Sequence, residues 1–156
     1  MATLKIKIGN NAAWDIETQY SNKIVLLDMP MNIPLKPKNI YSHSWYDENG
    51  DDEYMPQTLF YEPVTIAMKF GAKTDNISST GTLRGTVKSF LDAIMGKTFS
   101  FYAPVQGIGR GDCRVESLAE DAAYHNIPIA GGSTYEEQLV FTVNVKINDP
   151  YTPVTL

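Results

Sequence analysis

Apolar side chains recur at every second position along much of the chain, which is the pattern of half-buried β-strands. The clearest stretch spans residues 138–147, where every odd position from Leu139 to Ile147 is apolar. The same pattern predicts further strands at the following places: residues 4–8, 23–27, 63–70, 98–103 and 113–118. A glycine-rich stretch, residues 107–111, separates the last two and is expected to form a hairpin loop.

One segment, residues 79–97, has a helical period instead. Its apolar residues follow the spacing i, i+4, i+7, i+8 and i+11, and they are Leu83, Val87, Phe90, Leu91 and Ile94. Thr80 or Thr82 suits the first turn as a cap, and Gly96 suits the end, so we expect a helix over about residues 82–95.

A lone amphipathic helix buries its apolar stripe only against another layer. The predicted fold is therefore mainly β, an antiparallel β-sandwich or barrel-like structure with one packed amphipathic α-helix. Because the sequence contains no repeat and no long linker, we expect a single domain over residues 1–156.

Three prolines interrupt the pattern in MPMNIPLKPKNI, residues 29–40: Pro30, Pro34 and Pro37. Proline has no N–H to donate to a strand ladder, so this stretch is expected to be an extended surface arm or a sheet edge.

Composition narrows the possible functions. Thirteen basic against eighteen acidic side chains give a net charge of −5, which argues against tight binding driven by nucleic-acid phosphates. The N-terminal residues alternate apolar and charged side chains, so we expect no signal peptide, and the apolar runs are too short for a membrane helix. With a single cysteine, Cys113, synthesis in a reducing cytoplasm is expected.

The stretch SWYDENGDDEYMP, residues 44–56, concentrates acidic side chains at Asp47, Glu48, Asp51, Asp52 and Glu53. A helix–loop–helix calcium loop that begins at Asp47 would need glycine sixth and a bidentate glutamate twelfth, but these positions hold Asp52 and Thr58. Asn49-Gly50 favours a tight hairpin turn instead. We therefore interpret the stretch as an acidic hairpin loop for assembly or for lining a lumen.

The other reactive residues form no recognisable constellation. His43 and His125 are far apart and lack further ligands at zinc spacing, and no base is placed to activate Cys113. We therefore predict no catalytic, cofactor or metal site and a protein that is not an enzyme. Exposed aromatic residues such as Trp45, Tyr46 and Tyr54 would instead suit a carbohydrate-binding module, which is the alternative from a different class.

Three segments in order resemble the siphophage distal tail protein family, in its N-terminal ring-forming domain. They are an acidic loop before a long strand, DENGDDEYMPQTLFYEPVTIAMKF; a helix followed by a short aromatic strand, TLRGTVKSFLDAIMGKTFSFYAP; and a strand that runs into Asp-Pro, QLVFTVNVKINDPY. The resemblance covers roughly residues 23–150.

The resemblance implies a virion structural protein that forms a hexameric ring at the tail tip, in contact with other phage tail proteins. Related folds build the tail tube and the tail terminator, so a tail-tube or head–tail connector subunit is an alternative. Members of that family often carry a second, C-terminal domain, sometimes a carbohydrate-binding module. The implied location is the virion tail after synthesis in the host cytoplasm, with DNA passing transiently through the ring and no membrane partner.

Overall fold

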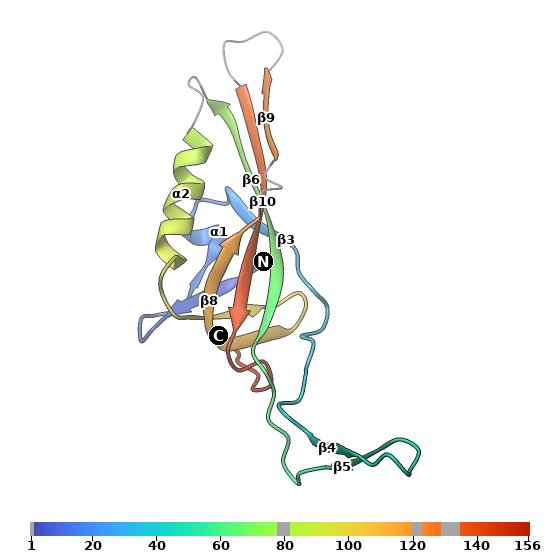
Figure 1. The fold of residues 1–156 in the computed structure, drawn as a ribbon. Helices are drawn as coiled ribbons and strands as arrows, with labels where there is room; N and C mark the ends of the chain where they lie inside the picture. The colour runs from blue at the N-terminus through green and yellow to red at the C-terminus, as the bar shows by residue number, and fades with distance from the viewer. Residues whose placement is uncertain (1, 78–81, 120–122, 129–134) are drawn as a thin grey trace.

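The computed structural model describes residues 2–77, 82–119, 123–128 and 135–156. Eight strands of these residues form one antiparallel sheet that curls into half a barrel (Figure 1). Their bounds are β1 Lys5–Ile8, β2 Trp14–Asp15, β3 Ile24–Asp28, β6 Val64–Ile77, β7 Phe99–Ala103, β8 Ile108–Leu118, β9 Ala123–Pro128 and β10 Tyr135–Ile147. The order is β2-β1-β7-β8-β10-β6-β3, and β9 pairs with the first half of β10 while β8 pairs with its second half. The predicted fold class is confirmed in its barrel-like form.

Strands β6 and β10 form the centre of the sheet, and their register explains the apolar period of the sequence. Phe141 lies opposite Phe70, and Val143 lies opposite Met68. Because side chains alternate between the two faces of a strand, these residues all point to one face. That inner face forms the hydrophobic core, in which all four of these side chains are buried.

The helix α2, Thr82–Ile94, covers the inner face next to β6 and β10 (Figure 1). Leu83, Val87, Phe90 and Ile94 of the predicted stripe are buried, and Leu91 is partly buried against the core. The helix ends as expected, because Gly96 has a φ of +69° that glycine adopts without strain. Of the two candidate caps, Thr80 lies outside the described residues and Thr82 is the first helical residue.

The period of the apolar residues did not predict the short elements. The helix α1, Ile16–Gln19, has only four residues, and β2 has two. Strand β9 was not predicted either, and both long strands extend beyond their predicted limits, β6 as far as Ile77 and β10 from Tyr135.

A hairpin loop joins β7 and β8 as predicted, but its predicted position, the glycine-rich stretch 107–111, was wrong beyond Gly107. The turn lies at residues 104–107, and β8 begins at Ile108. Gly109 is in the strand because the C-terminal segment crosses it: Val154 N donates to Gly109 O over 3.0 Å. A Cβ atom at position 109 would lie 1.9 Å from Val154 O. Close approach of a second backbone, rather than a turn, requires this glycine.

A second sheet consists of β4, Tyr41–Ser44, and β5, Asp51–Tyr54, which pair as a hairpin clear of the large sheet (Figure 1). Two extended segments connect it to the body. They are tied together by hydrogen bonds from Lys38 N to Phe60 O and from Glu62 N to Lys36 O, of 2.7 and 2.8 Å. The stretch with the three prolines is thus an extended arm, as predicted, with an isolated bridge between Pro37 and Tyr61. None of the described helices has the length and apolar character needed to cross a membrane.

Candidate functional site

Exposed apolar surface is concentrated in the arm and the hairpin, which we call the projecting segment (residues 30–62). Among the described residues, eight of the thirteen large hydrophobic side chains that are exposed belong to it: Met31, Leu35, Tyr41, Trp45, Tyr46, Tyr54, Met55 and Phe60. Scattered single exposed apolar residues are ordinary, whereas a group of them on one segment indicates an interaction surface. The projecting segment is therefore the candidate functional site.

The two faces of the hairpin differ in chemistry. Tyr41 lies opposite Tyr54, and His43 lies opposite Asp52, so these four side chains belong to one face. Ser42 and Ser44 lie opposite Glu53 and Asp51 on the other face. We call the first the aromatic face, defined by Tyr41, His43, Trp45 and Tyr54, and the second is polar and acidic. All eight strand residues of the hairpin are exposed.

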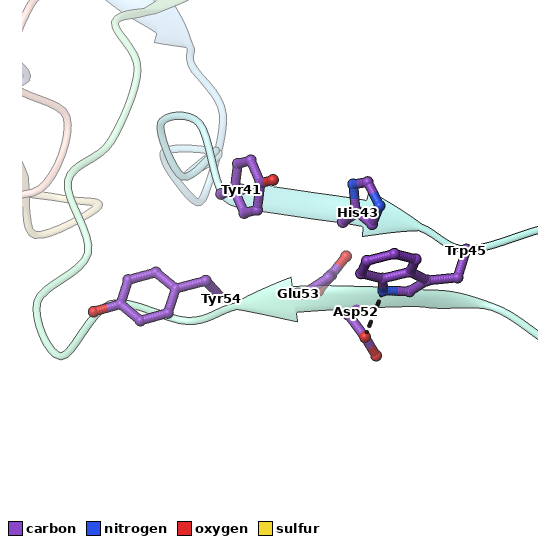
Figure 2. A pocket seen from close by; sticks show the side chains of 6 residues that line it. All are labelled: Tyr41, His43, Trp45, Asp52, Glu53 and Tyr54. Atoms are coloured by element: carbon purple, nitrogen blue, oxygen red, sulfur yellow. Dashed lines mark hydrogen bonds between the residues drawn. The ribbon is translucent and has the colours of Figure 1, made fainter. Parts of the chain in front are cut away.

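Trp45 extends the aromatic face past the end of β4. Its indole Nε1 donates to Asp52 Oδ2 over 3.0 Å, and its ring meets that of His43 edge to face, with 4.2 Å between the centroids. Figure 2 shows the indole lying across from β5, next to His43. These side chains, with Glu53, line a shallow hollow of about 400 Å³. Asp52 thus holds a half-exposed tryptophan in place instead of leaving it free to rotate.

The structure separates the acidic residues predicted as one loop. Asp47 and Glu48 lie in the connection between the strands, whereas Asp51, Asp52 and Glu53 belong to β5. The expected tight Asn-Gly turn was wrong in detail. The connection runs from residue 45 to residue 50, all of them described, and within it only Gly50 has a positive φ, of +83°. The connection is therefore longer than a two-residue turn, and it contains Asp47 and Glu48.

The three prolines lie at the base of the projecting segment and not in the hairpin. Pro30 and Pro37 are half-buried and Pro34 is exposed, while the neighbouring Met29 and Ile33 are buried in the core. The arm is thus anchored by two apolar side chains and presents its prolines outward or along the surface.

Sequence reasoning missed Tyr41 and His43. The stretch Tyr-Ser-His-Ser-Trp, residues 41–45, alternates with a period of two, and this signal could have identified a strand with an aromatic face. The signal was weak because neither side of the hairpin packs on the core, so no apolar partner strand marks it.

Cys113 is inside the core. It is fully buried, and its thiol donates to the carbonyl oxygen of Gly111 over 3.3 Å. Burial, together with the neighbouring charge of Asp112, raises the pKa of the thiol to about 12. The thiolate is the reactive form, so this residue is a poor nucleophile in the folded protein.

We therefore expect native protein at pH 8 to resist alkylation of Cys113 by iodoacetamide, and urea-unfolded protein to react completely within the same time. Since the folded pKa is raised, the stability that the buried neutral thiol contributes is present below the unfolded value and is lost as the pH rises toward 12. Mass spectrometry of the intact chain measures the labelling. Rapid labelling of the native protein would contradict the buried position.

A buried carboxylate, Glu137, lies on the core side of β10. Its Oε2 accepts a hydrogen bond of 2.5 Å from the hydroxyl of Tyr124 on β9, and this bond raises the pKa of the tyrosine. The guanidinium of Arg84 on α2 lies 4.7 Å from the centroid of the same tyrosine ring. The three residues link β10, β9 and α2, and we interpret them as a structural connection.

Among the described residues, no group of three or more His, Cys, Asp or Glu side chains is placed to hold a metal ion. Comparison with models of known protein families finds no match, and comparison with curated proteins finds none either.

Proposed function

We propose that this protein is a structural, non-enzymatic subunit of a phage or prophage tail, and that its copies assemble into a ring, most simply a hexamer, through which DNA passes. The observation that carries the proposal is the projecting segment, which holds most of the exposed large apolar side chains of the described residues and ends in a hairpin clear of the large sheet (Figure 1). The order of elements described above, which resembles that of the distal tail family, supports the same proposal.

A ring requires two different surfaces on each copy, because each copy contacts one neighbour on either side. The projecting segment provides one such surface, and the curled sheet, with exposed residues on its outer side, provides candidates for the other. Six copies, each with a net charge of −5, would carry about thirty negative charges, and an acidic lumen lets DNA slide without adhering.

Neutralising the acidic loop tests the proposal. We expect Asp47→Asn, Asp51→Asn and Asp52→Asn together to change ring formation or DNA passage, because they remove three of the five carboxylates of the hairpin. If the loop lies at an interface, the concentration needed for assembly should shift about tenfold or more, which corresponds to about 1.4 kcal/mol. If it lines the lumen, rings should persist and retain DNA at low salt. Light scattering and electron microscopy measure ring formation, and filter binding measures the retention of DNA.

A matched control carries the same charge change elsewhere: Asp92→Asn, Asp112→Asn and Asp149→Asn, all exposed and outside the projecting segment. This variant should assemble like the wild type. A triple loop variant that behaves like its control would show that the loop is only solvated surface. A wild-type chain that stays monomeric at high concentration, alone and with other tail proteins, would contradict the proposal itself.

Two related assignments are separated by the form of the assembly. A tail-tube subunit would polymerise into open tubes, whereas a distal tail or connector subunit would close into single rings. The hollow lined by Tyr41, Trp45 and Tyr54 favours a carbohydrate-binding module as the second candidate function, since aromatic rings stack on sugars. Glycan-array binding that is lost in Trp45→Ala would support that candidate, and silence across the array would oppose it.

A further inference from the structure

The hollow on the aromatic face of the hairpin is open to solvent and has the volume of a small ligand. The rings of Tyr41, His43 and Trp45 follow one another along β4 and its end (Figure 2). Tyr41 is 68% exposed, Trp45 is 50% exposed and Tyr54 is 69% exposed, so their rings are accessible. The hollow measures about 400 Å³, which is within the range of small-molecule sites.

The charge around the hollow selects the class of ligand. From residue 39 to residue 68 the sequence has six carboxylates and no lysine or arginine. Of the described residues that line the hollow, only His43 is basic. The resulting negative field repels phosphates and other anions and attracts cations. The faces of aromatic rings are negative as well, so they also attract a cation.

Asp52 places one of these carboxylates beside the rings. It lies opposite His43, and its Oδ2 accepts the hydrogen bond of 3.0 Å from the indole of Trp45. Because this oxygen is already engaged, a guanidinium would have to compete with the indole for a paired contact with both carboxylate oxygens. A quaternary ammonium has no N–H group and is bound by charge and ring contact alone. It therefore fits this set of side chains better than an arginine does.

We propose that the hollow binds an organic cation of the quaternary ammonium class, such as the trimethylammonium group of choline. The cation packs against the rings of Tyr41, Trp45 and Tyr54, and the carboxylate of Asp52 balances its charge. The site is complete in one copy, so this inference goes beyond the structural role and does not depend on ring formation. Because cation–π contacts at exposed positions are individually weak, we expect a dissociation constant on the order of millimolar.

A pair of ligands tests the role of the charge. Choline and 3,3-dimethylbutan-1-ol have the same shape, but in the alcohol a carbon atom replaces the charged nitrogen. Both ligands give a single sharp methyl signal, so the same NMR measurement, saturation transfer from the protein to that signal, compares their affinities. For the wild type at pH 8 the alcohol should bind about tenfold more weakly than choline, or worse. Equal affinities would overturn the proposal.

Substitutions in the hollow locate the site. Trp45→Ala removes the largest ring, and Asp52→Asn removes the charge but keeps an oxygen that can accept the indole N–H. We expect each to weaken choline binding about fivefold or more. The matched controls are Tyr46→Ala and Glu48→Gln, two exposed neighbours that do not line the hollow. At physiological salt each control should bind choline within about twofold of the wild type.

The remaining outcomes separate the cation from other ligands. Circular dichroism and thermal melting check that each variant is folded. Unchanged choline binding in folded Trp45→Ala or in folded Asp52→Asn would overturn the proposal, as would the absence of saturation transfer to choline in the wild type. A methyl glucoside that binds where choline does not would assign the hollow to a neutral sugar and overturn the proposal. All these measurements use dilute, dissociated protein, so their failure leaves the proposed ring standing, and a chain that forms no ring leaves the cation site standing.

Discussion

Replacing Phe90 with alanine is expected to lower the free energy of unfolding by about 3–5 kcal/mol, the range for removing a fully buried phenylalanine. Phe90 is fully buried on α2, and its ring lies 5.2 Å from that of Phe70 and 5.7 Å from that of Tyr20, centroid to centroid. The substitution leaves a cavity between the helix and the sheet. Domains are stable by only about 5–15 kcal/mol, so the loss is a large part of the total.

Urea denaturation followed by circular dichroism, in dilute solution where the chain is dissociated, measures this loss. Ser89→Ala is the matched control, because Ser89 is exposed on the same helix and its change should stay within about 0.5 kcal/mol. Phe90→Leu keeps most of the apolar volume, so its loss of unfolding free energy should lie between those of Phe90→Ala and Ser89→Ala. A loss of less than about 1 kcal/mol in Phe90→Ala would contradict the packing of α2 on β6 and β10.

The helix and the central strands were predictable because one physical rule governs them. Each buries a single face, so the period of its apolar residues reveals both its type and its buried side, as Phe90 and Phe141 illustrate. Strand limits were harder to predict. Beyond Phe70 the strand β6 continues through Gly71, which lies beneath the side chain of Leu27 from a distant part of the sequence. Tertiary contact overrides local preference at such positions.

The candidate site was predictable only in part, for a related reason. The acidic side chains between Asp47 and Glu53 could be identified by their charge, and Asn49-Gly50 predicted a reversal of the chain direction. The aromatic face could not be identified in this way, because it depends on which residues the register brings side by side. Tyr41 meets Tyr54, and His43 meets Asp52, only once the strands have paired.

Gly109 is the position where the sequence pattern and the structure differ most, and Gly109→Ala is expected to destabilise the protein by about 2–4 kcal/mol through steric overlap and lost hydrogen bonds. The new Cβ would lie 1.9 Å from Val154 O and 3.0 Å from Phe101 O, and backbone on both sides cannot yield as a flexible side chain does. The C-terminal segment must then move away. It would give up the hydrogen bond from Val154 N to Gly109 O and strain the 2.7 Å bond from Arg110 Nε to Pro150 O.

Replacing Gly85 with alanine is the control, and its expected effect on the free energy of unfolding has the opposite sign. Gly85 lies exposed within α2, with nothing within 4 Å of a new Cβ, so Gly85→Ala should stabilise the protein by up to about 1 kcal/mol. Urea denaturation compares the two. Carboxypeptidase digestion reports the segment directly, since residues 150–156 should be trimmed faster in Gly109→Ala than in the wild type. Equal stability and equal trimming would show that the C-terminal segment does not cross β8 at Gly109, and the glycine-rich stretch would then have to be explained by a turn after all.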